Sequence, residues 1–359
     1  MRDERWHVRA VPLPDGDEPR DWWIAGGRLS ADPVDGAEEL PGRFVAPGLV
    51  DAHVHLTFEA RDRLGLPRGS AELVDAHLDL QRRAGVLAVR DAGSLPGVAL
   101  DPEPPEGGRV IGCGPFLAPP DLFLAHLYEG TPPAEAVDAA RERVTNGWSW
   151  VKMIADHPGA GGSPLAARLG YPYDLVAAIA DAVHAEGGRL AVHVMGDIVR
   201  ELVEAGVDSV EHGTWADPRT VAEMAARGTA WCPTLTTVLH HLEPVADRIA
   251  AARAMLDRQR ETLPLAVELG VTLLAGTDEE PHGSVADEVA ALVRYGAPAQ
   301  AAIAAATTGA RRFLALPGLE PGAPADLVTF DRDPRDDVTA LAAPAAVVCG
   351  GGRVVSTGS

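Results

Sequence analysis

Lysine is almost absent from this 359-residue sequence. Of the 31 lysine and arginine residues, Lys152 is the single lysine and the others are arginine. Arginine keeps its charge in proteins, whereas a buried lysine can lose its proton and become a nucleophilic amine. A lone lysine in a chain that otherwise uses arginine therefore indicates a position where arginine cannot substitute. The alternative is that one surface lysine has survived by chance.

Cysteines and long apolar runs are also scarce. The three cysteines, Cys113, Cys232 and Cys349, lie far apart, which argues against a disulfide framework and favours a reducing cytoplasm. No run of about 18 apolar residues occurs, so no membrane span is expected, and the polar residues 1–16 do not resemble a secretory signal. The formal net charge of −21 would repel nucleic acid and anionic membranes. We expect a cytoplasmic homo-oligomer that binds a small-molecule substrate.

The middle of the chain, residues 47–317, alternates short apolar runs with helical stretches. The expected strands are 48–55, 86–91, 109–112, 150–154, 190–195, 209–212, 230–233 and 271–277. The expected helices between them are 71–84, 133–146, 173–186, 197–205, 218–227, 244–269 and 284–294, and glycine follows several of them. Strands that alternate with helices predict parallel βαβ units, and the number and length of these units are typical of a (β/α)8 barrel.

Both chain ends have a different texture from this middle part. Residues 1–46 and 318–359 contain short apolar pieces that are interrupted by proline, glycine and aspartate, a pattern that predicts small antiparallel strands. We therefore expect the two ends to form one small β-sandwich domain beside the barrel.

Side chains of the kinds that bind metals fall at the ends of the expected strands. His53 and His55 end the first strand, and their spacing of two places both side chains on one face. The others are Lys152 in the fourth strand, His193 in the fifth, His212 at the end of the sixth and Asp278 just after the eighth. Each alone could be a core histidine or a helix cap. Because functional residues of such barrels gather at the C-terminal strand ends, the joint pattern predicts one metal site.

The predicted ligand set suits divalent ions. Imidazole and carboxylate favour zinc, with cobalt or manganese as alternatives. Two adjacent ions need a bridging anion to offset their repulsion, and an unmodified lysine is poor in this role. A lysine carboxylated by carbon dioxide is a two-oxygen anion, which would explain why position 152 resists arginine. We therefore expect two metal ions bridged by carboxylated Lys152.

Five motifs resemble those of the amidohydrolase superfamily. They are Pro47-Gly-Leu-Val-Asp-Ala-His53-Val-His55-Leu, Trp150-Val-Lys152-Met, Ala191-Val-His193-Val, Val210-Glu-His212-Gly-Thr and Ala275-Gly-Thr-Asp278. A sixth stretch, Leu319-Glu-Pro-Gly-Ala-Pro-Ala-Asp-Leu-Val, resembles the return of the chain to the small β domain. Glu211-His-Gly-Thr, Pro233-Thr-Leu and Pro281-His-Gly are most similar to the imidazolonepropionase-related and prolidase-like branch.

The resemblance implies roles for these residues. His53 and His55 would hold the more buried metal together with Asp278, His193 and His212 would hold the more exposed one, and carboxylated Lys152 would bridge them. Hydroxide between the ions would attack an amide carbonyl, and Asp278 would carry its proton to the leaving group. The implied substrates are dipeptides, N-acyl amino acids or cyclic amides.

The substrate contacts are less well defined by the sequence. The chain lacks both the Gly-Gly-His-Gly stretch that is frequent in the branch and the tyrosine often found after Pro-Thr-Leu. His126, His157, His240 and His282 in the expected loops are candidate contacts, with solvated loop histidines as the alternative.

Other functions stay open from the sequence. One is a mononuclear zinc deaminase of an aminated heterocycle, with Lys152 idle, and another is a lactone or ester hydrolase on the same site. A non-catalytic scaffold is disfavoured because the ligand set is complete, and a serine hydrolase because no Gly-x-Ser-x-Gly motif occurs.

Overall fold

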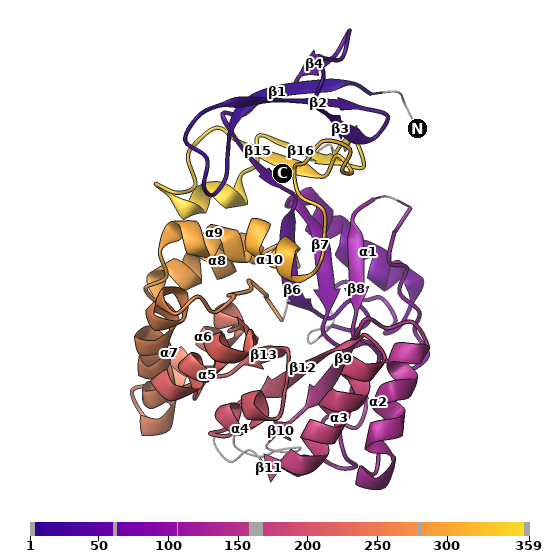
Figure 1. Cartoon of the computed structure of the whole chain (residues 1–359), viewed down its shortest axis with the longest axis vertical. Coiled ribbons are helices and arrows are strands. Elements are labelled where there is room, and N and C mark those ends of the chain that lie inside the picture. The colour runs from indigo at the N-terminus through magenta and orange to yellow at the C-terminus, as the bar shows by residue number, and fades with distance from the viewer. Residues whose placement is uncertain (1–3, 60–62, 106, 158–167, 279–281, 355–359) are drawn as a thin grey trace.

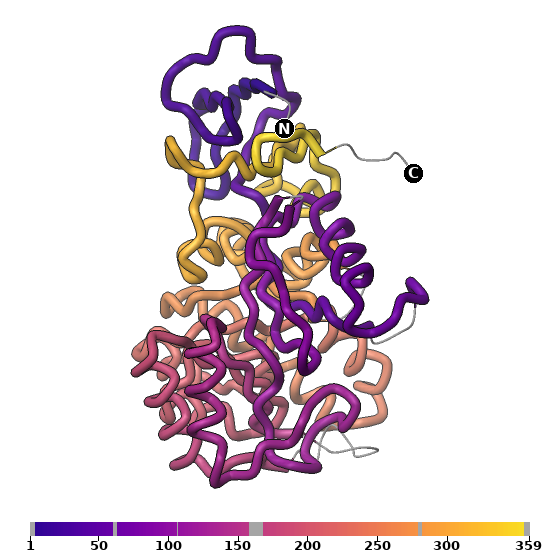
Figure 2. The backbone as a smooth tube through the Cα atoms, turned by 90° about the vertical axis from the view of Figure 1, so that its right-hand side faces the viewer, coloured from indigo at the N-terminus to yellow at the C-terminus, as the bar shows by residue number. Residues whose placement is uncertain are grey.

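The structure is a computed structural model that describes residues 4–59, 63–105, 107–157, 168–278 and 282–354. Figure 1 shows a small sheet above a larger body, in which helices lie outside a set of parallel strands. The indigo and yellow segments from the two ends of the chain lie together at the top of Figure 2, far from each other in sequence.

The small sheet is built from both chain ends. Its strands are β1 (Trp6–Pro12), β2 (Arg20–Ala25), β3 (Arg28–Ser30), β4 (Glu38–Glu39), β5 (Phe44–Pro47), β15 (Leu327–Phe330), β16 (Ala346–Cys349) and β17 (Gly352–Arg353). Their order is β17-β16-β15-β5-β1-β2-β3, and β4 pairs with β1. Antiparallel pairing of β5 with β15 joins strands from the two ends in one sheet, while the expected β-sandwich domain stays a prediction. The division of the chain at residues 46 and 318 stays a prediction.

The body holds two parallel sheets. One has the order β6 (Leu49–Val54), β7 (Val86–Asp91) and β8 (Arg109–Gly112). The other has the order β14 (Ala230–Cys232), β13 (Ser209–His212), β12 (Arg189–Val194) and β9 (Trp150–Ile154). A short antiparallel pair, β10 (Asp156–His157) and β11 (Arg168–Leu169), follows β9. These strands agree with seven of the eight predicted ones.

Backbone hydrogen bonds connect the two parallel sheets on both sides. On one side, Leu117 N donates to Lys152 O at 2.8 Å, and Ile154 N donates back to Leu117 O at 3.0 Å. On the other side, Leu274 N donates to Trp231 O at 2.9 Å, and Ala52 N donates to Ala275 O at 2.8 Å. The sheet of this mixed α/β fold is therefore curled, with the ends of β6, β9, β12 and β13 brought towards one another.

Helices connect the strands and cover their outer side. They are α1 (Ala71–Arg83), α2 (Ala136–Thr145), α3 (Tyr173–Ala185), α4 (Val199–Glu204), α5 (Pro218–Arg227), α6 (Leu235–Leu242), α7 (Ala250–Glu268), α8 (Val285–Arg294), α9 (Ala299–Ala305) and α10 (Thr308–Phe313). Three 3-10 turns are η1 (Pro133–Glu135), η2 (Glu243–Val245) and η3 (Val338–Ala342). None of the described helices has both the length and the apolar character needed to cross a membrane.

Two segments differ from the sequence-based expectation. The predicted strand 271–277 does not form a regular strand, and it contacts β14 through an isolated bridge between Trp231 and Leu273. Its later N–H groups bond elsewhere, because Ala275 N donates to Ala305 O and Thr277 N donates to the Asp51 carboxylate. The segment expected as a loop after residue 235 forms α6, and the expected helix 244–269 is divided into η2 and α7.

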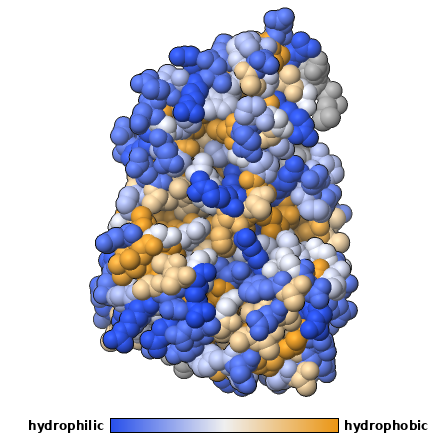
Figure 3. All heavy atoms as spheres, viewed as in Figure 1, coloured by the Kyte–Doolittle hydropathy of each residue, from blue (hydrophilic) through white to orange (hydrophobic). Residues whose placement is uncertain are grey.

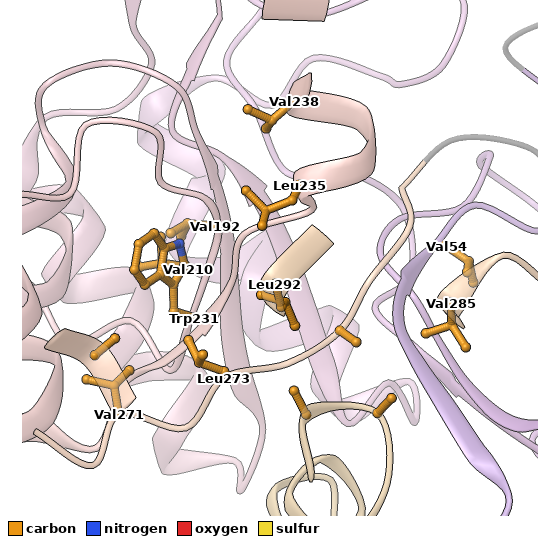
Figure 4. Packing of buried hydrophobic residues seen from close by; sticks show 14 of the residues in the cluster. Val54, Val192, Val210, Trp231, Leu235, Val238, Val271, Leu273, Val285 and Leu292 are labelled. Carbon is orange, nitrogen blue, oxygen red and sulfur yellow. The ribbon is translucent and has the colours of Figure 1, made fainter. Parts of the chain in front are cut away.

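Apolar side chains pack between the curled sheet and its helices. Figure 4 shows part of this cluster, with Val192, Val210 and Trp231 on neighbouring strands and Leu235 and Val238 on α6. Each of these five side chains is at most 2% exposed. On the face in Figure 3, polar side chains dominate the outline, and apolar ones appear mainly across the middle. This packing fixes the strand ends that carry the predicted ligands.

Candidate metal centre

All six predicted ligands line one cavity of about 710 Å³ at the C-terminal ends of the parallel strands. His53 lies in β6 and His55 directly after it, while Lys152 lies in β9. His193 lies in β12, His212 ends β13, and Asp278 follows the segment that bridges to β14. The structure therefore brings together side chains that are up to 225 positions apart.

The polar atoms of these side chains point towards a common volume. Asp278 Oδ1 lies 3.2 Å from His53 Nε2 and also 3.2 Å from His55 Nε2. Lys152 Nζ lies 3.4 Å from His53 Nε2. The ring centroids of His193 and His212 are 4.5 Å apart. His53, His212 and Asp278 present ligand atoms within 4.8 Å of one another, which is close enough for one ion.

Two of the predicted ligands reach this volume from strained backbone conformations. His212 and Asp278 have φ angles of +66° and +65°, although neither is glycine. Such conformations cost about 1–3 kcal/mol each and gather at functional sites. Gly276, two residues before Asp278, lies so close to β6 that a Cβ would stand 2.6 Å from His53 Cβ. The Gly-Thr-Asp segment can therefore approach His53 only because position 276 has no side chain.

Hydrogen bonds at Nδ1 orient three of the four imidazoles. His53 Nδ1 lies 2.7 Å from Glu211 Oε2, and His55 Nδ1 lies 3.0 Å from Gly93 O. His212 Nδ1 lies 2.6 Å from Thr234 Oγ1. In each ring Nε2 is left to face the cavity, as in metal sites where an outer partner fixes the tautomer.

The surroundings of His193 indicate whether a metal ion would suit this site. Its Nε2 is buried, and within the described part of the chain it has no hydrogen-bond partner. A buried polar atom without a partner is costly, and a metal ion would provide one. The donor set of four imidazoles, one carboxylate and one lysine therefore fits divalent ions of the zinc type.

Similarity to known proteins extends over nearly the whole chain. The model of the amidohydrolase family matches residues 44–354. This chain belongs to the amidohydrolase family. An uncharacterized protein of Mycobacterium tuberculosis is 36% identical over 366 aligned residues, covering 98% of this chain and 96% of that protein. Ochratoxinase of Aspergillus niger is 29% identical over 170 residues, covering 44% of this chain and 35% of that enzyme.

A solved structure also shares the fold of this amidohydrolase. A Xaa-Pro dipeptidase with methionine bound in its active site superposes with a TM-score of 0.80 at 23% identity, covering 98% of this chain and 100% of that one. The predicted membership of the amidohydrolase superfamily is confirmed, and the assignment to its imidazolonepropionase-related and prolidase-like branch stays a prediction. The prediction of an enzyme that hydrolyses carbon–nitrogen bonds is confirmed at the level of the family.

The electrostatics of the amidohydrolase site favour deprotonated donors. Burial lowers the pKa of Lys152, against the opposing effects of Glu211 and Asp278. Burial, together with the neighbouring cations, lowers the pKa of His193 well below its usual value and that of His212 to about 3. Because metal ligands must be deprotonated, these shifts suit metal binding.

Two further site groups behave differently. Burial alone would raise the pKa of Asp278, but His53 and His55 hold it well below its usual value, so the carboxylate is charged. Burial and Lys152 lower the pKa of His53, yet Asp278 and Glu211 outweigh them and the net shift is upward.

A buried ionic network beneath the site was missed by sequence reasoning. Glu211 Oε1 lies 2.7 Å from Arg90 Nη2 and accepts a bond from Ser209 Oγ at 2.6 Å, while its other oxygen faces His53. Burial raises the pKa of Glu211, but Arg90 and His53 bring it well below the usual value. The available signal was the Glu211-His212 motif, but nothing in it identified Arg90 as the partner.

A second network fixes the segment before Asp278. Asp51 is fully buried and accepts bonds from Thr277 N at 3.0 Å and Thr277 Oγ1 at 2.7 Å. Gln81 of α1 donates to the same carboxylate at 3.3 Å. The signal in the sequence was Asp51 in the first-strand motif, to which no role was assigned.

The four candidate substrate contacts have different outcomes. His126, His157 and His282 line the cavity. His240 was expected in a loop, but it lies in α6 and is exposed, and among the described residues the neighbouring His241 lines the cavity in its place. His282 is 8% exposed, and its ring centroid lies 4.0 Å from that of His77, with the two rings tilted by 38°. Pro281 of the Pro-His-Gly motif lies outside the described residues.

Proposed function

We propose that this amidohydrolase cleaves the C–N bond of a dipeptide, an N-acyl amino acid or a cyclic amide with two divalent metal ions. The observation that carries the proposal is the convergence of four imidazoles, one charged carboxylate and one buried lysine, the pKa of which is lowered by burial, on a single cavity. The names of fold relatives, a Xaa-Pro dipeptidase and an ochratoxinase, support this class of substrate.

We also propose a barrel, a small second domain and a set of ligands for each of the two ions. The curled sheet would be a (β/α)8 barrel over residues 47–317, and residues 1–46 and 318–359 would form a small β-sandwich domain. His53 and His55 with Asp278 would hold the more buried ion, and His193 with His212 the more exposed one. Zinc is the first choice, with cobalt and manganese as alternatives. Ions bound here would polarise the substrate carbonyl and make hydroxide available near neutral pH.

Lys152 is suited to carboxylation because its amine is buried and favours the neutral form. The Nζ lone pair would form a bond to the carbon of carbon dioxide, and loss of a proton from nitrogen would leave a carbamate. That anion would offset the repulsion between two cations, which an ammonium could not do. Arginine at this position would stay charged and would not form the carbamate.

Asp278 is the proton carrier in this proposal. Its Oδ1 faces both first-strand histidines at 3.2 Å, and its low pKa leaves the carboxylate without a proton of its own. It takes the proton of the attacking water and delivers it to the leaving nitrogen. The C–N bond then breaks, and a carboxylic acid and an amine leave the site.

The test is a hydrolysis panel on protein prepared with zinc and bicarbonate. Dipeptides, N-acyl amino acids, cyclic amides and lactones would each be incubated with the parent and with metal-stripped protein. Release of amine by the loaded protein alone would support the proposal. Release of ammonia from aminated heterocycles would replace it with the mononuclear deaminase, and cleavage of lactones alone would replace it with an ester hydrolase.

A further inference from the structure

Three phenylalanine rings line the cavity beside the ligand histidines. The Phe58 and Phe116 ring centroids lie 4.9 Å and 5.6 Å from that of His55. Phe123 lies 5.1 Å from Phe116 and 6.5 Å from His193. These rings form a continuous aromatic wall that reaches from the first-strand ligands to the ligand on β12.

An aliphatic wall belongs to the same cavity. It is formed by Val238 and Leu242 of α6, Val245 of η2 and Ile249 just before α7. Val238 and Leu242 are 2% and 4% exposed, so most of this wall is packed against the protein. Ile249 is 38% exposed, which places a large apolar side chain where the wall meets solvent.

A buried carboxylate fixes the aliphatic wall in place. Glu288 of α8 accepts bonds from Leu235 N and Thr236 N, both at 2.8 Å, and from Thr236 Oγ1 at 3.0 Å. The two backbone N–H groups lie in the first turn of α6, where a helix offers them no acceptor of its own. Because Glu288 of α8 fixes the first turn of α6, the helix holds Val238 and Leu242 in defined positions at the cavity.

Few of the described side chains that line the cavity carry a formal charge. Apart from Lys152 and Asp278, the carboxylate and the arginine among its described lining residues are Glu59 and Arg68. Both also line a smaller adjoining opening, so they lie together. A charged substrate group placed between the aromatic and aliphatic walls would lose its hydration without a partner, at a considerable cost in free energy.

We propose that the substrate is an amide that carries a bulky, uncharged apolar group, at least the size of an octanoyl chain or a naphthyl ring. That group lies between the aromatic wall and the aliphatic wall. The inference rests on the proposed amide hydrolysis and narrows its substrate class. The apolar group belongs to the acyl side or to the amine side, and the two arms of the test separate these cases.

The acyl arm uses N-acetyl-, N-butyryl-, N-octanoyl- and N-(2-naphthoyl)-alanine, and the amine arm uses N-acetylated alanine, phenylalanine and naphthylalanine. On the side that enters the cavity, kcat/KM should rise by about three- to fourfold for each added methylene. A flat or falling series in both arms, with amine still released from the acetyl compounds, would overturn the inference and leave the hydrolase standing.

The Ile249→Asp variant places a charge at the rim of the aliphatic wall. It should lower the ratio of kcat/KM for the largest substrate to that for the acetyl compound by about tenfold or more. Leu269→Asp is the matched control, because Leu269 is 43% exposed and outside the cavity lining among the described residues. This control should leave the ratio unchanged, and an equal fall in both variants would contradict the assignment of the wall.

Binding without turnover separates this inference from the hydrolase proposal. Acetate, octanoate and 2-naphthoate, with the corresponding amines, would be titrated by calorimetry into the metal-loaded protein. If no amide is cleaved, the hydrolase proposal fails, and the titration then decides what the cavity accepts. Tighter binding of the large probes, with a negative heat-capacity change, would support the apolar site. Equal affinity for large and small probes would overturn it.

Discussion

Two fully buried glutamates show how differently this fold treats the same side chain. Glu211, under the predicted ligand histidines, is held by Arg90 and His53, and its pKa lies well below the usual value. Glu288, at the start of α6, meets backbone and hydroxyl donors of Leu235 and Thr236, and burial raises its pKa to about 7. Both side chains have no solvent exposure, so the difference arises from the charge of their partners.

The molecule therefore has a charged buried region around Glu211 and a buried region without cationic partners, the neutral region, around Glu288. Under the predicted ligands, Glu211 is an anion that pairs with Arg90 and orients His53. At the junction of α6 and α8, Glu288 has no cationic partner among its described contacts, and its role is to satisfy orphan donors of a helix. The first region should respond to changes through metal binding and activity, and the second through stability and pH.

The largest effect is expected from Asp278→Asn, in the charged region. The amide keeps the shape of the side chain but cannot take up a proton. We expect kcat to fall by about 10²- to 10⁴-fold, while much of the metal stays bound. The measurement is steady-state hydrolysis beside elemental analysis of the same sample. Activity near that of the parent would show that another group carries the proton.

Arg90→Met should produce the largest loss of stability. It leaves the Glu211 carboxylate buried without its cation, which costs about 3–5 kcal/mol. Urea unfolding of the metal-free protein measures this loss. The double variant Arg90→Met with Glu211→Gln should recover part of it, because the uncompensated charge is removed. If the double variant is less stable than the sum of the two single changes predicts, the buried, uncompensated charge of Glu211 is not the cause of the lost stability.

The pH dependence of stability tests the neutral junction. The pKa of Glu288 in the folded protein, about 7, lies above its ordinary value of 4.5. Its contribution to stability is therefore complete below about pH 4.5 and is lost as the pH rises through about 7, a change of about 3 kcal/mol. Glu288→Gln should flatten the unfolding free energy over this interval, and an unchanged slope would refute the assignment.

Glu211→Gln is the matched substitution in the charged region. Because the folded pKa of Glu211 lies below its ordinary value, its contribution is present above about pH 4.5 and is lost on acidification. The substitution should also weaken metal binding by about 10- to 100-fold, since Glu211 orients His53. Competition with a chelator measures this change. Glu288→Gln should bind metal as the parent does, and equal losses would remove the distinction between the regions.

The grouping of the predicted ligands in one cavity could be expected from the sequence because it depends on local patterns. Strand periodicity located the ends of β6, β9, β12 and β13, and parallel strands bring such ends to one side of the fold. The single lysine added a signal that did not depend on strand boundaries. Together these features predicted that His53, Lys152 and His193 would face one site, and all three line one cavity.

Interactions between distant segments could not be predicted in this way. Helix α6 was missed because its cap is Glu288, which lies 53 positions beyond Leu235. The same omission led to His240 being chosen as a loop residue, although the helix turns His241 to the cavity. The pair formed by Arg90 and Glu211, 121 positions apart, likewise has no local signature.

The most direct test of the metal centre is the number of metal ions per chain. Parent and Lys152→Ala proteins would be purified with bicarbonate and measured by elemental mass spectrometry. The proposal predicts two ions in the parent and one or none in the variant, since the carbamate that joins the two sites is lost. One ion in both proteins would contradict it, because Lys152 would then be a bystander at a mononuclear site.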